Sequence, residues 1–125
     1  MINRLHTSKS TQTIFQTINQ TTGLQPFALA KISIALSIKS KRKITDEELN
    51  TDTDGLELNR QTICGEFDSL LSCLIAYNEE KELNEDTVFP AYFKAHIDRG
   101  AKLLLNEYKY DKNFYAHLCN LESGI

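Results

Sequence analysis

Residues 27–38 are apolar on nearly every side of the helix that they would form. Pro26 precedes them, and a proline suits the first position of a helix because its missing N–H has no partner there in any case. The apolar residues are Phe27, Ala28, Leu29, Ala30, Ile32, Ile34, Ala35, Leu36 and Ile38. A helix that is apolar on most faces has to be buried in a core or in a subunit interface. We therefore expect this helix to be buried, and both the domain core and a subunit interface stay open as its surroundings.

Helical spacing of apolar residues recurs along the rest of the chain. The expected helices cover residues 7–23, the segment that starts at Pro26, residues 61–80, a segment that opens at Pro90, and a last one that opens at Asp111. Residues 44–55 are polar and acidic, as in a solvated loop or a short fragment, and residues 56–58 alternate like a short extended piece. These patterns predict one all-α domain over residues 1–125, a compact bundle of about five helices.

The acidic and basic residues are distributed unevenly. Residues 1–43 contain seven Lys and Arg and no Asp or Glu, whereas the remaining 82 residues contain seven basic and all 17 acidic residues. Such an asymmetry favours a polyanion or an acidic partner on one side of the molecule. No apolar run approaches the roughly 20 residues of a membrane span, and the start of the chain lacks the apolar core of a signal peptide. We expect a cytoplasmic protein with no membrane partner.

Four basic residues at the exit of the second expected helix are the main candidates for phosphate contacts: Lys39, Lys41, Arg42 and Lys43. A cationic cluster of this kind releases counterions when it binds DNA. The alternative is a solvated helix end whose charge the acidic loop that follows it balances. Weaker members of the same expected surface are Lys31, Arg4 and Lys9.

The residues that carry chemistry in enzymes and metal sites show no pattern typical of either. The three cysteines, Cys64, Cys73 and Cys119, form no CxxC pair, and the histidines His6, His96 and His117 lack the HxxxH spacing of zinc sites. The three thiols are interpreted as core residues of a reducing compartment, and no spacing supports Cys64 and His96 as a nucleophilic pair. The sequence has no Gly-rich phosphate loop. We expect no cofactor, no metal and no catalysis.

The aromatic residues and one glycine indicate packing. Phe67, Tyr77, Tyr92, Phe93 and Phe114 occur at core spacings and are interpreted as packing residues instead of platforms for stacked bases. Gly100 lies inside the helix expected from Pro90. A glycine there indicates the close approach of another backbone or of a ligand.

Two blocks of sequence resemble a known family. The first runs from Gly55 to Phe67 (GLELNRQTICGEF), and the second runs from His96 to Leu104 (HIDRGAKLL). With the basic two-helix N-terminus, they resemble DndE, the small accessory protein of bacterial DNA sulfur modification, over most of residues 5–106. Arg60 and Arg99 lie in these blocks. Each either binds phosphate bidentately or fixes the fold by pairing with Glu57, Glu66 or Asp98.

The resemblance implies a fold, a process and partners. It implies a compact helical protein with a ribbon-helix-helix-like N-terminal core, assembled as a homotetramer, with affinity for nicked double-stranded DNA. The process is phosphorothioation, in which sulfur replaces a non-bridging oxygen of the DNA backbone. The implied partners are a cysteine desulfurase, an iron–sulfur protein and an ATPase-like protein. The preferred hypothesis is therefore a non-catalytic subunit that binds duplex DNA through its phosphates.

Two other classes of function stay open at this point. The protein is an assembly module if the basic segment binds an acidic partner and the apolar second helix forms a subunit interface. It is a transcriptional regulator of ribbon-helix-helix or helix-turn-helix type if it binds one operator sequence, which the short turn between the first two helices permits.

Overall fold

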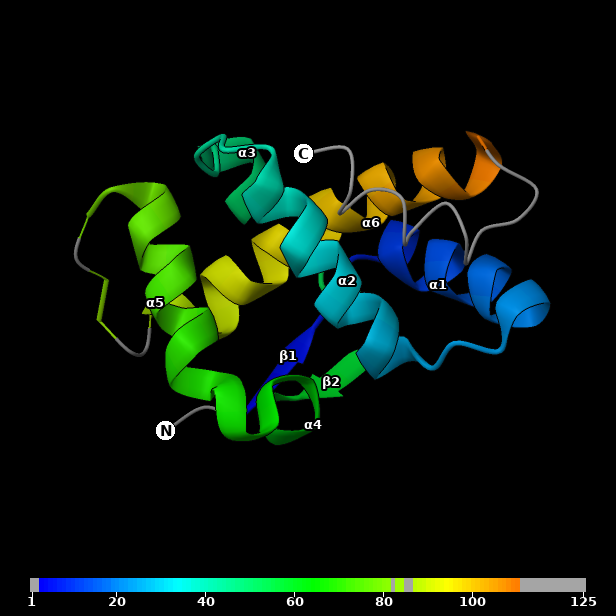
Figure 1. The fold of residues 1–125 in the computed structure, drawn as a ribbon, viewed down its shortest axis with the longest axis horizontal. Helices are drawn as coiled ribbons and strands as arrows, with labels where there is room; N and C mark the ends of the chain where they lie inside the picture. The colour runs from blue at the N-terminus through cyan, green and yellow to red at the C-terminus, as the bar shows by residue number, and fades with distance from the viewer. Residues whose placement is uncertain (1–2, 82, 85–86, 111–125) are drawn as a thin grey trace.

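Helices make up most of the chain in the computed structural model, which describes residues 3–81, 83–84 and 87–110 (Figure 1). The elements in chain order are β1 (Arg4–His6), α1 (Lys9–Thr22), α2 (Pro26–Lys39), α3 (Asp46–Leu49), β2 (Glu57–Asn59), α4 (Arg60–Cys64), η1 (Gly65–Phe67), α5 (Asp68–Glu79), η2 (Thr87–Tyr92) and α6 (Phe93–Tyr110). The predicted all-α class is confirmed as a mostly helical fold, to which the structure adds one small sheet. The helix expected from Asp111 lies outside the described residues.

Helix α6 forms the centre of the core. Every residue from Tyr92 to Ala101 is buried, so the first half of this helix is enclosed on all sides. Helix α2 crosses it near the middle of the molecule (Figure 1). A Cβ atom added to Gly100 would lie 1.7 Å from the carbonyl oxygen of Ser33, so the two backbones meet where Gly100 has no side chain. The close backbone approach that Gly100 indicated is confirmed.

The two strands form an antiparallel pair in which Arg4 lies opposite Asn59, Leu5 opposite Leu58 and His6 opposite Glu57. Leu5 and Leu58 are buried, while their neighbours along each strand are exposed, as the alternation of a strand requires. The order of β1, α1 and α2 is strand, helix, helix. This is the order of elements in a ribbon-helix-helix core, but here β1 pairs with β2 of the same chain.

The expected helix over residues 61–80 is interrupted. Helix α4 ends at Gly65, whose φ of 52° and ψ of −130° do not continue a helix. The turn η1 follows, and α5 then begins at Asp68. The helix expected from Pro90 is present as α6 from Phe93, and Pro90 itself lies in the π-helical segment η2 that precedes it. Phe89, just before the proline, has extended angles, as the residue before a proline favours.

The acidic segment after α2 contains the short helix α3, which the side chain of Thr45 caps by accepting from the N–H of Glu48. None of the helices in the described part of the chain is long and apolar enough to cross a membrane.

Candidate nucleic-acid interface

Lys39, Lys41, Arg42 and Lys43, here called the basic cluster, are all exposed where α2 ends. The backbone of Lys41 has a φ of 60°, and its N–H donates to the carbonyl of Ile38 at 2.9 Å. This left-handed residue turns the chain out of the helix. The Nζ of Lys43 lies 3.0 Å from Glu80 Oε2, but both side chains stay more than half exposed. The structure thus brings the four predicted residues together on one surface segment.

Arg99 holds the main chain beneath the basic cluster. Its Nη2 donates to the carbonyl oxygens of Arg42 at 2.8 Å and Ser37 at 3.2 Å, and its Nη1 donates to that of Lys43 at 3.2 Å. Its Nε donates to Ser37 Oγ at 2.8 Å, and Nη1 lies 3.5 Å from Glu48 Oε1. Arg99 is 6% exposed. The structure favours the structural alternative for this residue, with Glu48 as its acidic partner instead of Asp98.

Helix α5 fixes the same segment from the other side. The side chain of Asn78 donates to the carbonyl of Arg42 at 2.9 Å, and Glu79 Oε1 accepts from the N–H of Ile44 at 2.9 Å. Sequence reasoning missed both residues, because a contact between residues 35 or 36 positions apart leaves no periodic pattern. The basic cluster is therefore a short segment whose main chain is held by hydrogen bonds and whose cationic side chains are exposed.

Ser37, His96 and Glu79 form a buried polar chain under α2. The Nδ1 of His96 lies 2.8 Å from Ser37 Oγ, and its Nε2 lies 3.3 Å from Glu79 Oε2. Burial, together with the charge of Arg99, lowers the pKa of His96 to about 4, so the imidazole is neutral at neutral pH. Since Ser37 and His96 are fully buried, this arrangement has no access to a substrate and is part of the core.

Arg60 is also enclosed. Its Nε and Nη2 donate to the two carboxylate oxygens of Asp68 at 2.6 and 2.7 Å, and its guanidinium lies 5.0 Å from the centre of the Phe89 ring. The hydrogen bonds from Arg60 hold the pKa of Asp68 below its usual range. At 8% exposure, Arg60 is positioned to fix α4 against α5. Asp68, which was not among the expected acidic partners Glu57 and Glu66, forms this ion pair.

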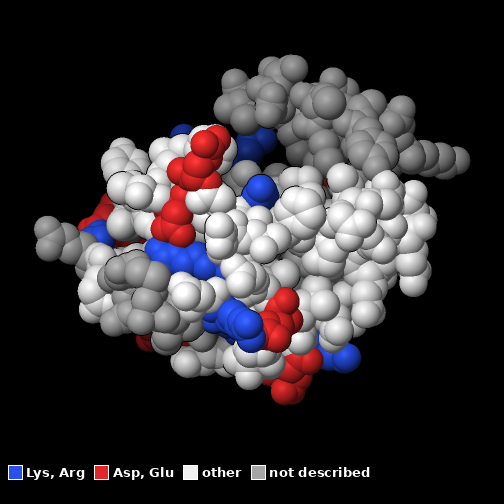
Figure 2. All heavy atoms as spheres, turned by 90° about the horizontal axis from the view of Figure 1, so that it is seen from below, with Lys and Arg blue, Asp and Glu red and all other residues white. Residues whose placement is uncertain are grey.

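The weaker basic candidates lie apart from one another. Lys31 is exposed on α2, with its Nζ 5.5 Å from the centre of the Phe27 ring. Arg4 pairs with Glu57 at 3.1 Å, and Lys9 Nζ donates to Gln12 at 2.9 Å. On the face drawn in Figure 2, basic and acidic side chains lie next to one another and no broad area has a single charge. We therefore base the candidate interface on the basic cluster.

The second half of the acidic segment is fastened to the start of α1. Asp52 Oδ2 accepts from the N–H of Lys9 at 2.8 Å, and this hydrogen bond lowers the pKa of Asp52. Thr51 Oγ1 donates to Asp98 Oδ2 at 2.8 Å, and the N–H of Gly55 donates to the carbonyl of Thr7 at 2.8 Å. Asp52 therefore satisfies a backbone N–H in the first turn of α1.

Asp98 is the centre of a second buried network. It accepts from the N–H of Ser8 at 3.1 Å, from Thr11 Oγ1 at 2.6 Å and from Lys94 Nζ at 2.8 Å. Lys94 and Asp98 are both nearly inaccessible, so the pair ties α6 to the start of α1.

The predicted core thiols and aromatic residues are only partly confirmed. Cys64 is buried, and burial raises the pKa of its thiol to about 11, whereas Cys73 is exposed on α5 and Cys119 lies outside the described residues. Tyr92 and Phe93 are buried as expected. The core assignment of Phe67 and Tyr77 is wrong, because these side chains are 56% and 84% exposed. Phe114 lies outside the described residues.

No metal-binding group is present among the residues that the structure describes: no three His, Cys, Asp or Glu side chains come together there. Cys64 and His96 contact different partners, namely Asp68 for the thiol, and Ser37 and Glu79 for the imidazole.

Comparison with known families identifies the fold. A sequence model described as DNA sulphur modification protein DndE matches residues 4–112. The chain belongs to the DndE family. The match covers most of the chain and includes the basic cluster, Arg60 and Arg99, so the resemblance seen in the sequence is confirmed.

Solved structures of the family share the fold. The crystal structure of DndE from Escherichia coli B7A, involved in DNA phosphorothioation modification, has a TM-score of 0.65 and 23% sequence identity, and the match covers 83% of this chain and 98% of that chain. A glycine-to-lysine double mutant of DndE, involved in DNA phosphorothioation, has a TM-score of 0.65 and 20% identity, with 82% and 97% of the two chains covered. A search of curated proteins finds no match.

Proposed function

We propose that this protein is a non-catalytic, DNA-binding accessory subunit of DNA phosphorothioation in the cytoplasm. It binds duplex DNA, with nicked duplex as a preferred form, through backbone phosphates and without reading sequence. The observation that carries the proposal is the basic cluster: four exposed cations on one segment of a DNA sulphur modification family member.

The geometry of the basic cluster suits phosphate binding. Arg99 and Asn78 hold the main chain of the segment, so the cationic side chains start from a fixed base and less conformational freedom is lost on binding. Phosphate contacts of this kind position a protein on DNA and carry no sequence information. Because the chain has a net charge of −3, its attraction to DNA is local and comes from this segment.

Assembly of several chains would raise the affinity of the basic cluster for DNA. In the proposed homo-oligomer, a tetramer, several basic clusters bind one duplex, and each later contact is intramolecular. The proposed partners are the sulfur-transfer proteins of the process: a cysteine desulfurase, an iron–sulfur protein and an ATPase-like protein. The protein would hold the backbone for these enzymes. Its own Ser37, His96 and Cys64 support a role without catalysis, because all three are buried.

A titration of fluorescently labelled duplex, intact and nicked, tests the proposal by anisotropy at several salt concentrations. We expect binding whose logarithm of affinity falls linearly with the logarithm of salt concentration, by about 0.9 for each phosphate neutralised. Two duplexes of unrelated sequence should bind alike. No binding near physiological salt would contradict the proposal and favour the assembly module, and strong preference for one sequence would favour the regulator.

A further inference from the structure

The outward face of α5 carries a row of large apolar side chains. Phe67, Leu70, Leu74 and Tyr77, here called the α5 stripe, are 56%, 54%, 39% and 84% exposed. Leu70, Leu74 and Tyr77 are spaced by three or four residues along one side of α5, and Phe67 is the last residue of η1, just before the helix begins. The opposite side of α5 is the one that enters the core, through Ile75 and Glu79.

The α5 stripe contains no charged side chain, and the one charged residue between its members in the sequence, Asp68, pairs with Arg60. From Ser69 to Asn78 the sequence contains no Asp, Glu, Lys or Arg, and Cys73 adds an exposed thiol beside the row. The outward face of a helix on a protein surface is normally polar or charged. A contiguous exposed apolar row that contains two aromatic side chains is typical of a protein–protein interface.

The two ends of the α5 stripe carry opposite charges. Glu66 is exposed just before α5. Lys81 is exposed just after it, and Lys41 and Arg42 lie at the same end because Asn78 donates to the carbonyl of Arg42. Glu80 is exposed at this end too, but it pairs with Lys43 at 3.0 Å, so basic side chains are in excess there. When two copies of α5 pack antiparallel, the acidic end of each lies against the basic end of the other. A parallel arrangement would bring like charges together.

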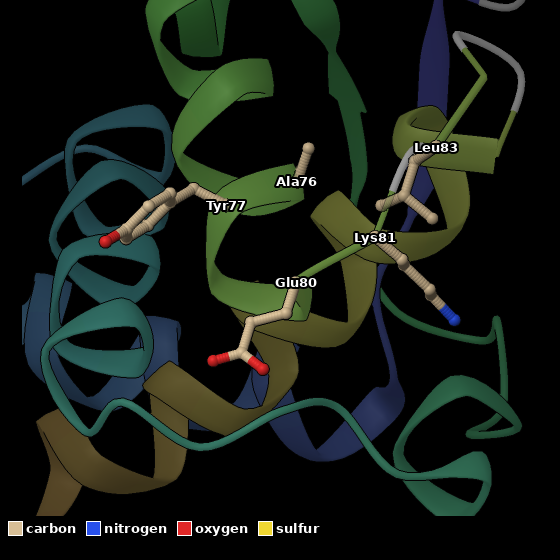
Figure 3. Close-up of a pocket in the computed structure, with 5 residues that line it drawn as sticks. All are labelled: Ala76, Tyr77, Glu80, Lys81 and Leu83. Carbon is tan, nitrogen blue, oxygen red and sulfur yellow. The ribbon is translucent and has the colours of Figure 1, made fainter.

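A hollow lies beside the α5 stripe at its basic end. It has a volume of about 720 Å³ and is lined by Ala76, Tyr77, Glu80, Lys81 and Leu83. Figure 3 shows Tyr77 and Leu83 on either side of Ala76. Antiparallel packing brings Glu66 and Phe67 of one copy to the end of α5 where the other copy has this hollow. The apolar wall of Ala76 and Leu83 suits the phenyl ring. Lys81 suits the carboxylate, since Glu80, the other charged residue of the hollow, already pairs with Lys43.

We propose that the α5 stripe is the interface with a second copy of this chain, packed antiparallel about a two-fold axis. An interface of this type is self-complementary, as the charged ends and the hollow require. A standard interface buries about 800 Å² on each partner. The α5 stripe supplies its apolar centre, since one aromatic side chain alone buries about 150–250 Å², and the charged ends supply its rim. The inference rests on the homo-oligomer part of the proposed function.

The mass of the full chain in solution tests this interface, by light scattering after gel filtration over a range of protein concentrations. The variant Leu70→Glu/Leu74→Glu adds two charges within the α5 stripe. Its matched control, Thr13→Glu/Gln16→Glu, adds two charges to the exposed side of α1. We expect the first variant to halve the mass of the assembly, or to reduce it to one chain, and the control to assemble as the wild type does. Circular dichroism checks that both variants fold.

Charge reversal tests the antiparallel arrangement. Glu66→Lys and Lys81→Glu should each raise the dissociation constant of the assembly about tenfold, and the double variant should restore it. Oxidation should link two chains through Cys73, which is near the middle of the α5 stripe, in a Cys119→Ser background, and Cys73→Ser should abolish the link. Failure of the double variant to restore assembly would overturn the arrangement.

Two outcomes separate this inference from the proposed function. If the wild type assembles and Leu70→Glu/Leu74→Glu leaves its mass unchanged, the α5 interface is wrong and the homo-oligomer stands. If the wild type is a single chain at every concentration, both the interface and the homo-oligomer are wrong. The DNA titration remains an independent test of the basic cluster in either case.

Discussion

Arg99 occupies the middle of α6 and supports the basic cluster from below, through hydrogen bonds to the carbonyls of Ser37, Arg42 and Lys43. A lysine at this position keeps the charge but lacks the planar fork of donors. We expect Arg99→Lys to lower the free energy of unfolding by about 2 kcal/mol, since buried carbonyls lose their partners. Urea denaturation measures this. Lys102→Gln, an exposed change on the same helix, should stay within about 0.5 kcal/mol of the wild type.

The same variant separates support from direct contact. A residue that contacts a phosphate contributes about 0.9 to the salt dependence of DNA binding. Because Arg99 is buried, the salt slope of folded Arg99→Lys should equal that of the wild type. If the salt slope of Arg99→Lys is smaller than that of the wild type by about 0.9, Arg99 contacts a DNA phosphate directly.

His96 makes the stability of the protein depend on pH. Its pKa is about 4 in the folded chain and about 6.5 in an unfolded one. Between these values the unfolded chain binds a proton that the folded chain does not, so stability falls as the pH drops from about 6.5 toward 4. We expect a loss on the order of 2 kcal/mol between pH 7 and pH 5.

Urea denaturation at the two pH values checks this loss. His96→Gln should lack most of it, whereas His6→Gln, a change at an exposed histidine, should retain it. A wild type equally stable at pH 7 and pH 5 would show that His96 titrates normally in the folded protein.

The ion-pair partners of individual residues could not be predicted from the sequence. The pattern left Arg60 and Arg99 open between phosphate binding and ion pairs, and neither actual partner was among those considered. Asp68 meets Arg60 because Gly65 breaks the helix between them, and Glu48 meets Arg99 through the fold of α3 over α6. Such pairs depend on where elements pack, which composition and spacing do not specify.

At the scale of elements, the crossing of α2 and α6 depends on Gly100. A methyl group there would meet the backbone of Ser33, which cannot move aside as a flexible side chain would. We expect Gly100→Ala to lower the free energy of unfolding by about 3 kcal/mol, in spite of the better helix propensity of alanine. Lys102→Ala, two residues along the same helix, is the matched control and should have little effect. Thermal or urea denaturation of both variants decides, and a stabilised Gly100→Ala would contradict the close crossing.

Apolar periodicity predicted where α1 and α2 lie along the chain. The expected burial of α2 on most faces is only partly confirmed, because Phe27, Lys31 and Ala35 are exposed and the fully enclosed stretch belongs to α6. Helix α5 differs, because apolar residues occupy both its core side and its outward side. Ile75 enters the core while Leu70, Leu74 and Tyr77 face outward. A pattern of this type predicts a helix but does not tell which side meets the core. This ambiguity caused the wrong core assignment of Phe67 and Tyr77. The outward side of α5 is also the surface on which the proposed second copy binds.

At the scale of the whole molecule, an acidic protein carries its candidate DNA contact on one short segment. Four of the seven basic residues of the acid-free N-terminal third lie within the basic cluster, and the others are spread over β1, α1 and α2. The asymmetry of charge was visible in the sequence. The hydrogen bonds by which Arg99, Asn78 and Glu79 hold the main chain at and just after the basic cluster were not visible in the sequence, since these residues come from α5 and α6.

The central claim is that the basic cluster binds DNA phosphates, and the salt dependence of binding to nicked duplex tests it most directly. The variant Lys39→Gln/Lys41→Gln/Arg42→Gln/Lys43→Gln is compared with the wild type and with Lys102→Gln/Lys109→Gln, which removes two exposed charges elsewhere. We predict that the first variant binds roughly 10- to 100-fold more weakly at low salt, with a salt slope flatter by about three to four for each chain bound. The control should keep the slope of the wild type. An unchanged affinity and slope in the fourfold variant would contradict the account.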